Sequence, residues 1–427
     1  MLGKFTKHAL LGGLVLVASM AMTATAFAEA TAYGNVNFNA IYQMTNNDAA
    51  GVGNGGLDPS PPQAGTAGDT GGGTIHMHSR PSKFGVKGSM DSDMGKITGV
   101  IEVDAAGRAG TASWGASSSA PHIRLRHAYG TVGNLLVGRT WGGLATDFSW
   151  FPSTLDAWGA YGASVVFSDP RMSQVRYTLP IGDNKLVLSA EENTGVDANI
   201  AGDRPSLPRI VGAFHLMAGP AKVQIVVAMT TWQFNETGKD LDDGYTAGSD
   251  LDGNGADDDV LTASGTMFGV NAAAAVGPGT LKFHYYTGQG GFQMNSILIL
   301  GGSSRGFFFD GEDLKVVSST DMTLSYNMKL DDMSQINATY GSVAISDPVD
   351  TPDDPTDAYC SGCTGGSGSS IHVNYIRAIA PGVNWGVEFA TKTLNYDDNS
   401  FAVEAGEDAS GGSATNSAVI FSMNVGF

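Results

Sequence analysis

Hydrophobic and polar side chains alternate with a period of two along much of this chain. In the segment 35–44, nearly every second residue is apolar, and most of the residues between are amides. The last segment, 421–427, repeats the pattern, with Phe, Met, Val and Phe on one parity and Ser, Asn and Gly on the other. Successive side chains of a β-strand point to opposite faces, so each segment is predicted to be a strand with one apolar and one polar face.

The same alternation predicts sixteen strands, and the links between them alternate in length. Tight links such as 91–95 and 132–134 are followed by long ones such as 142–170 and 235–261. This layout is typical of a transmembrane β-barrel with short periplasmic turns and long external loops, whose closure satisfies every backbone group in lipid. We therefore predict an all-β fold, a 16-stranded antiparallel transmembrane β-barrel. The predicted strands span 33–45, 75–90, 96–105, 122–132, 135–141, 171–179, 185–193, 207–217, 221–234, 262–276, 280–287, 315–328, 333–345, 370–379, 384–393 and 415–427.

The first residues have the three parts of a secretory signal peptide. Lys4 and Lys7 precede an apolar run over 9–22, and Ala26-Phe27-Ala28 forms an A-x-A cleavage site. The alternative, a transmembrane anchor, needs about 20 apolar residues, and this run is shorter. We expect residues 1–28 to be cleaved and residues 29–427 to form one barrel domain.

Composition supports an exported barrel and excludes other classes. Only 15% of the 427 residues are charged, 59 are Gly, and the formal net charge of -19 argues against a nucleic-acid binder, which would be basic. Removing residues 1–28, which hold two Lys and no acid, gives -21. The two Cys exclude a disulfide-dense scaffold. A strand face in contact with lipid carries few charges, which explains the low charged fraction.

Several motifs resemble those of Gram-negative outer-membrane porins. Residues 82–88 (SKFGVKG) resemble the second-strand motif of the general porins, and 124–129 with 135–141 (RLRHAY and LLVGRTW) resemble their paired fourth and fifth strands. Residues 154–156, 174–177 and 191–193 are most similar to the DcaP-type branch of trimeric porins. The terminal Phe427 resembles the signature that the outer-membrane assembly machinery reads.

The resemblance implies a homotrimer in the bacterial outer membrane, with the third long loop of each barrel folded into its lumen. It implies a passive diffusion channel for small hydrophilic solutes, with a preference for anions, including dicarboxylates. The implied partners are outer-membrane lipids, lipopolysaccharide and, through Phe427, the assembly machinery. It implies no required cofactor.

The residues that would line the narrowest part of the channel follow from strand parity. Arg124 and Arg126 share one face of the fourth strand, and the other face carries Ile123, Leu125, His127 and Tyr129. Two guanidinium groups at i and i+2 on the lumen face would form a basic ladder for carboxylates. The predicted constriction consists of Arg124, Arg126, Arg139 and Arg176 on the wall, with Asp147 and Asp156 opposite on the third loop.

Two alternatives remain open at this stage. The arginines could simply pair with carboxylates of the wall, and the aromatic third loop, 141–169, could pack outside the lumen. Parity places further charged and polar residues in the lumen, with mixed signs. They are Lys83, Lys87, Glu102, Asp104, Lys185, Glu191, Lys222, Lys282, His284, Glu388 and Lys392.

Two long loops carry candidate chemistry. Asp250, Asp252, Asn254 and Asp257 in the fifth loop start like a calcium loop, with alternating oxygen ligands, although the twelfth position is Leu261 instead of Glu. We weigh a surface Ca²⁺ site, or divalent bridges to lipopolysaccharide, against a solvated acidic loop. In the seventh loop Cys360 and Cys363 predict a local disulfide in an oxidising compartment; Thr364 in place of His excludes c-type haem attachment.

The sequence favours a porin and leaves two rival classes. An outer-membrane barrel enzyme would need a catalytic set, and no Ser is placed visibly beside His and an acid, so no catalytic residue is predicted. A structural or adhesin barrel would have a plugged lumen and conduct no ions. Ion conductance therefore separates the porin from the structural barrel, and turnover identifies the enzyme.

Overall fold

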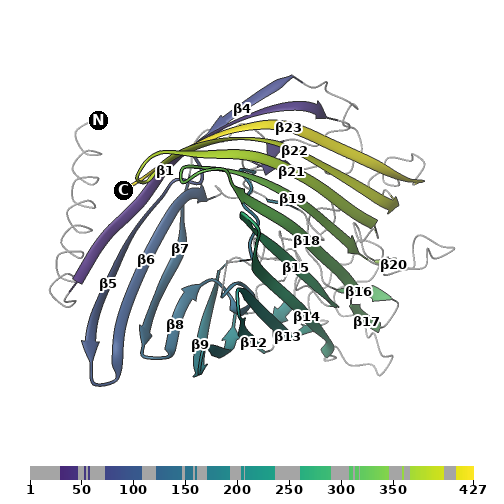
Figure 1. The fold of residues 1–427 in the computed structure, drawn as a ribbon. Helices are drawn as coiled ribbons and strands as arrows, with labels where there is room; N and C mark the ends of the chain where they lie inside the picture. Colours follow the sequence, from purple (N-terminus) through teal and green to yellow (C-terminus); the bar gives the residue numbers. More distant parts are fainter. Residues whose placement is uncertain are drawn as a thin grey trace, which may run out of the picture.

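The wall of the molecule is a closed antiparallel β-barrel of sixteen strands (Figure 1). Consecutive strands pair along the chain, and β1 pairs with β23 from Asn35–Gly426 to Asn46–Asn416, which closes the ring. This confirms the predicted fold class. The computed structural model describes residues 29–46, 52–53, 56–57, 73–107, 122–146, 150–156, 159–160, 171–192, 203–205, 207–235, 260–289, 307–310, 313–316, 318–345, 358–359, 366–398 and 410–427.

Every predicted strand corresponds to one strand of the wall. Two of the sixteen wall strands are interrupted: β4 and β5 together form one of them, and β11 and β12 form the other. The wall strands are β1 (Glu29–Asn46), β4 (Thr74–His78) with β5 (Lys83–Ser92), β6 (Gly95–Gly107), β7 (His122–Val132), β8 (Leu135–Thr140), β9 (Met172–Ile181), β10 (Asn184–Glu191), β11 (Asp203–Pro205) with β12 (Arg209–Ala218), β13 (Ala221–Asn235), β14 (Val260–Val276), β15 (Gly279–Gln289), β18 (Ser318–Lys329), β19 (Ser334–Ile345), β21 (Gly366–Ala380), β22 (Val383–Asp398) and β23 (Ser410–Gly426).

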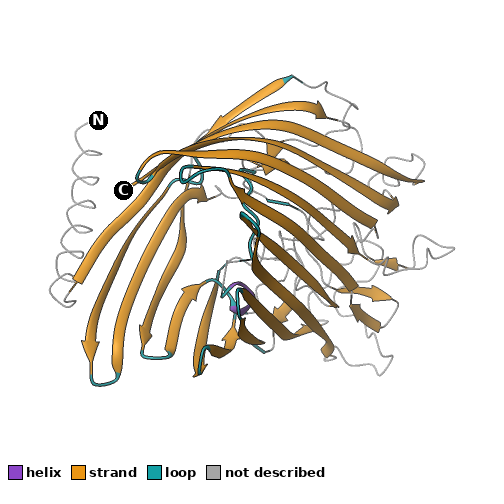
Figure 2. Ribbon diagram, viewed as in Figure 1, coloured by secondary structure: helices purple, strands orange, loops and turns teal. Residues whose placement is uncertain are grey.

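The other elements of the described residues are short. A 3-10 turn, η1 (Gly143–Ala145), is the helical element in Figure 2, and the remaining strands pair in small sheets of their own. No helix in the described part of the chain is long and apolar enough to span a membrane. The small strands are β2 (Val52–Gly53), β3 (Gly56–Leu57), β16 (Phe307–Asp310), β17 (Asp313–Val316) and β20 (Ala358–Tyr359).

The two faces of the wall differ as the alternation predicts. Outward positions such as Phe38, Val137 and Val227 are apolar and exposed, whereas inward positions such as Asn271 and Asn374 are polar and buried. In a soluble protein the apolar atoms would be the buried ones. An exposed apolar belt around a closed ladder is the surface of a barrel that spans a lipid bilayer.

The short turns and the C-terminus lie at one end of the barrel. Gly133, Gly182 and Gly277 adopt φ values of 56°, 60° and 56° in two-residue turns, a conformation that favours glycine. At this end Gly34 exchanges two backbone hydrogen bonds of 3.0 Å with Phe427. A Cβ at Gly34 would lie 2.6 Å from the Lys83 carbonyl oxygen, so a larger residue would push the closing strands apart.

The second predicted strand differs from the expectation of one continuous span. It is interrupted at 79–82, where Pro81 has no N–H to donate to the ladder. The Ser82 hydroxyl compensates by accepting a hydrogen bond of 3.0 Å from the Asn37 N–H and donating one of 3.2 Å to the Asn37 carbonyl.

The outward face of β13 tests the membrane-spanning assignment. Val227→Lys should destabilise the folded barrel by about 2–4 kcal/mol, because an outward Lys near the bilayer midplane must leave water. The measurement is a denaturant titration of refolding into lipid vesicles. Val227→Leu is the matched control and should leave the midpoint nearly unchanged; equal stability of the Lys and Leu variants would contradict the assignment.

Candidate functional site: the channel interior

The third long loop lies inside the barrel against the inner wall. Its described parts are 141–146, 150–156 and 159–160. They contact the inward faces of β10, β12, β13, β15, β18, β21 and β22. The prediction of an inward-folded third loop is confirmed, and packing outside the lumen is excluded for these residues. The loop therefore covers one side of the lumen.

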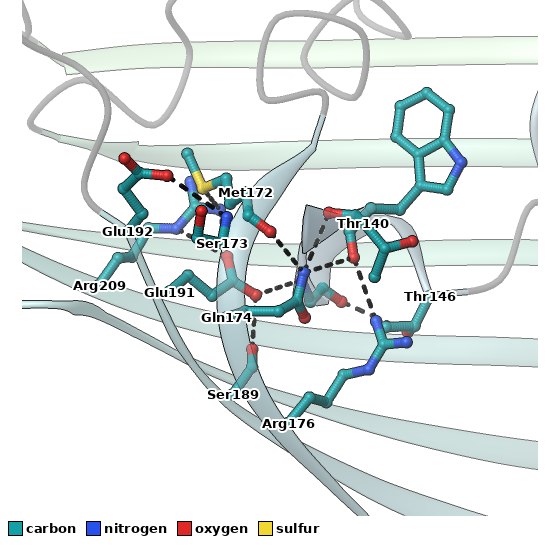
Figure 3. Close-up of polar contacts among 12 residues, drawn as sticks. Thr140, Thr146, Met172, Ser173, Gln174, Arg176, Ser189, Glu191, Glu192 and Arg209 are labelled. Atoms are coloured by element: carbon teal, nitrogen blue, oxygen red, sulfur yellow. Dashed lines mark hydrogen bonds and ion pairs between the residues drawn. The ribbon is translucent and has the colours of Figure 1, made fainter. Parts of the chain in front are cut away.

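The loop begins at a buried ion pair. The Glu191 carboxylate pairs with the Arg209 guanidinium and accepts hydrogen bonds from the Gly143 N–H and, at 2.6 Å, from the Ser189 hydroxyl (Figure 3). A Cβ at Gly143 would lie 2.7 Å from the Ser189 hydroxyl oxygen, so only glycine lets the backbone approach this closely. The next residue, Leu144, packs on a buried apolar patch of the inner wall. The wall residues of that patch are Val187, Val211, Ala213, Val226, Ala228, Met267 and Tyr286.

The carbonyl groups at the start of the loop are also held. Gln174 donates hydrogen bonds of 3.0 and 2.9 Å to the carbonyls of Thr140 and Trp141, and Arg176 donates one of 3.1 Å to Trp141 (Figure 3). Arg176 therefore lies on the lumen face as predicted, but it supports the loop as well as lining the wall.

Aromatic stacking fixes the middle of the loop. Trp150 stacks on His284 of β15, with ring centroids 4.7 Å apart and planes inclined by 17°. The Lys282 ammonium on the same strand donates a hydrogen bond of 2.6 Å to the Phe151 carbonyl. Both strand residues were placed in the lumen by parity, and the structure shows that they hold the loop.

Charged side chains of β22 hold the far end of the loop. Glu388 on β22 accepts hydrogen bonds of 2.7 and 3.1 Å from the backbone N–H groups of Leu155 and Asp156. The Asp156 carboxylate is buried and lies 2.9 Å from the Lys392 ammonium. Asp156 was predicted to face the arginine ladder across the lumen, and the structure instead places its carboxylate in an ion pair with the wall behind the loop. Asp147 lies outside the described residues.

The wall across from the loop carries an interlocked charge cluster. Arg124 bonds the Asp104 carboxylate at 3.1 and 2.7 Å, and Arg126 bridges Glu102 and Asp104 at 2.7 Å each. Lys83 lies 3.8 Å from Glu102. Pairing with wall carboxylates, the alternative considered for these arginines, is therefore what the structure shows, although the Arg124 side chain remains 42% exposed.

A β-bulge in β7 changes the predicted parity. Glu102 pairs with His127 whereas Val103 pairs with Leu125, so Arg126 is the extra residue in the ladder. His127 then turns inward with Arg126, and its ring lies 2.9 Å from the Thr140 hydroxyl. Strict alternation predicted His127 on the lipid face, which is wrong because the extra residue shifts the parity.

Arg139 does not join the cluster on the lumen face. It shares its parity on β8 with the exposed, outward Leu135 and Val137, and its guanidinium lies 3.8 Å from Glu192 beyond the end of β10. Across the 133–134 turn, Arg139 pairs with the outward Ala128. The prediction that Arg139 lines the constriction is therefore wrong.

Sequence reasoning missed one residue of this wall, Arg171. Its side chain is 6% exposed and its guanidinium lies over the Trp141 ring, 4.7 Å from the centroid. The structure describes no carboxylate or hydrogen-bond acceptor in contact with it. Burial, reinforced by Arg126 and Arg124, lowers its pKa from the usual value. The predicted strand 171–179 starts at Arg171 on the parity opposite to Arg176, which would direct it away from the lumen. In the structure Arg171 instead precedes β9 at the end of the third loop, outside the alternation of the strand.

The described cluster is electropositive. Four cations, Lys83, Arg124, Arg126 and Arg171, face two carboxylates, Glu102 and Asp104. In channels generally, the fixed charges of the wall and the width of the lumen determine which solutes pass.

The residues of the predicted calcium site, disulfide and signal peptide lie outside the part of the chain that the structure describes. They are Asp250, Asp252, Asn254 and Asp257, then Cys360 and Cys363, and residues 1–28. Within the ranges given above, no group of three or more His, Cys, Asp or Glu side chains could hold a metal ion.

A closed sixteen-stranded wall with an apolar belt and a loop docked in its lumen defines a porin-type outer-membrane barrel. The fold is similar to that of the outer membrane channel DcaP of Acinetobacter baumannii, with 18% identity, a TM-score of 0.67, and coverage of 94% of this chain and 98% of that chain.

Two further porins share the fold. An anion-selective porin from Comamonas acidovorans matches with 12% identity, a TM-score of 0.55, and coverage of 93% of this chain and 99% of that one. Salmonella typhi OmpF matches with 10% identity, a TM-score of 0.53, and coverage of 93% and 97%. The sequence matches no protein-family model and no curated protein.

The loop anchor on β22 yields a direct prediction. Glu388→Ala removes the acceptor for two loop N–H groups and the partner of the His372 ring, which lies 3.0 Å away. We expect the loop end to detach, so that single-channel current becomes noisier and larger neutral polymers enter the pore. Glu388→Gln, which retains one acceptor oxygen, should show a smaller change, and currents of Glu388→Ala as quiet as those of the unmodified protein would contradict the anchor.

Proposed function

We propose that this protein is an outer-membrane diffusion porin that passes small hydrophilic solutes and prefers anions, including dicarboxylates. The preference for anions over cations is inferred from Arg171, whose buried guanidinium has no carboxylate partner among the described residues. Removing a charge from water without pairing it is unfavourable, so an anion from solution that reaches Arg171 relieves that cost.

The surrounding charges support the same sign. Arg124 and Arg126 already neutralise Glu102 and Asp104, so these carboxylates do not cancel the field of Arg171. The docked loop narrows the lumen on the other side, and its charged Asp156 is neutralised by Lys392. The net charge of -19 thus does not describe the interior wall.

The rest of the assignment follows the porin-type fold. We propose a homotrimer of barrels in the outer membrane, in contact with lipopolysaccharide and delivered through recognition of Phe427 by the assembly machinery. No catalytic residue and no resident cofactor form part of this function. A surface Ca²⁺ bound by the acidic fifth loop and a disulfide between Cys360 and Cys363 remain predictions about loops outside the described residues.

Planar-bilayer recording tests the proposal. The purified protein should conduct, and the reversal potential in a KCl gradient should indicate preference for chloride. Absence of conductance would favour a structural or adhesin barrel, and turnover of a lipid or peptide substrate would favour a barrel enzyme.

Arg171 should set much of the anion preference. Arg171→Met keeps the stem of the side chain and removes its charge, and the chloride-to-potassium permeability ratio should fall roughly threefold, because a unit charge a few ångströms from a hydrated ion is worth about 0.5–1 kcal/mol. Arg171→Lys should preserve the ratio. Arg139→Met is the matched control on the outward face and should change the ratio little.

Equal effects of the Arg171→Met and Arg139→Met variants would contradict the assignment. The difference should shrink as the KCl concentration rises, because salt screens the field of a fixed charge.

A further inference from the structure

A second cationic site lies on the short-turn side of the docked loop, away from the Arg124–Arg126–Arg171 wall. It is a pocket of about 370 Å³, lined by residues of β9, β10, β12, β13 and β14 and by Trp150 of the loop. Asn134 and Asp183, which belong to two short turns, line the pocket at its outer edge. The labels β9, β12 and β13 in Figure 1 mark this part of the wall, in which β10 lies between β9 and β12.

Two lysines supply the positive charge of this pocket. Lys185 on β10 and Lys222 on β13 both line it, and neither forms an ion pair or hydrogen bond with any residue that the structure describes. The register places Lys185 beside His215 and Lys222 beside Met217, so the two lysines flank β12 from either side. Asp183 is the single carboxylate among the lining residues.

The remaining lining groups suit a short carbon chain between two charged ends. Pro180 and Met217, on the inward parity of their strands, provide apolar surface, while Asn134 and Asn184 provide amides. The polar groups deeper in the pocket are already engaged: Gln224 and Asn271 bond one another at 2.9 Å, and His215 lies 2.8 Å from the Thr146 hydroxyl of the loop. Among the lining residues, the two ammonium groups are therefore the unpaired cations that an anionic ligand would meet.

The pocket has the size of a small-ligand site and continues the lumen wall. Cavities of about 300–1,000 Å³ are the usual range for small molecules. Along the inward face of β9, Thr178 follows Arg176, which lies next to the arginine wall, so a solute leaving that wall meets the pocket next. Lysine is a flexible point charge, which lets two of them adjust to the separation of two carboxylates.

We propose that this pocket is a second binding site, in which Lys185 and Lys222 together hold a small dicarboxylate on the periplasmic side of the docked loop. Its role in transport rests on the proposed channel function, because the site would receive anions that have passed the loop. Its occupancy is brief, because a channel site must bind well enough to be entered and weakly enough to be left.

Lysine footprinting of the purified full-length protein in detergent tests binding without requiring conduction. The protein is labelled with a water-soluble N-hydroxysuccinimide ester, with and without succinate, and the modification rate of each lysine is read by mass spectrometry. Saturating succinate should slow labelling of Lys185 and Lys222 at least roughly fivefold. Lys96 and Lys329, which lie near short turns outside the pocket, are the internal controls and should be unaffected.

Two comparisons decide the outcome. Acetate, with one carboxylate, should protect much less at equal ionic strength, and Lys222→Gln should abolish the protection of Lys185 by succinate. Unchanged labelling of Lys185 and Lys222 in succinate, or equal protection by acetate, would overturn the proposal.

Bilayer recording then separates this proposal from the proposed function. Lys185→Gln/Lys222→Gln should shorten succinate-induced current interruptions several-fold, while Lys96→Gln/Lys329→Gln, which removes the same charge near the same rim, should not. If footprinting shows protection but the channel prefers potassium, the proposed selectivity fails and the pocket remains. If the channel prefers chloride but succinate protects neither lysine, the pocket fails and the selectivity remains.

Discussion

Every backbone N–H and C=O of a chain that crosses hydrocarbon must find a partner within the protein, because lipid offers none. Here the pairing of β1 with β23 meets this condition by leaving no open edge in the ring. Two consequences follow from closure. Alternate side chains must face lipid, which accounts for the apolar outer belt and for a charged fraction of only 15%. The other half face an enclosed lumen, where polar side chains can be bonded to one another and to an inserted loop.

The loop and the wall depend on each other. An inward-facing patch such as Val211, Val226 and Met267 would be unfavourable against water, and Leu144 of the loop covers it. Glu191 and Glu388 would be costly buried carboxylates alone, and the loop supplies N–H groups to both. With one side of the lumen occupied in this way, the cationic residues Lys83, Arg124, Arg126 and Arg171 of the wall outnumber its two described carboxylates, Glu102 and Asp104. In the proposed channel, selection by charge would then depend on how the loop is held.

The sequence was sufficient for the number, type and approximate limits of the wall strands, because a period of two is a local property that lipid enforces at every strand. It also placed Glu102, Lys282 and Glu388 on the lumen face. It could not predict the bulge that turns His127 inward, because the extra residue appears in the pairing with β6 and not in the sequence pattern of β7. It could not pair Asp156 with Lys392, which are far apart in the chain, nor find Arg171, whose place depends on the path of the loop. Long-range contacts inside the lumen, rather than local pattern, decide these positions.

The channel geometry depends on where the third loop lies against β18. A disulfide trap tests that position most directly. Ser153 and Asn327 are in contact, with a hydrogen bond of 2.6 Å between their side chains. In a Cys360→Ser/Cys363→Ser background, Ser153→Cys/Asn327→Cys should oxidise readily in the folded barrel and leave single-channel conductance unchanged, because the bond only fixes the loop where it already lies. Failure of the pair to oxidise, or a change of conductance when it does, would show that the loop occupies another position in the open channel.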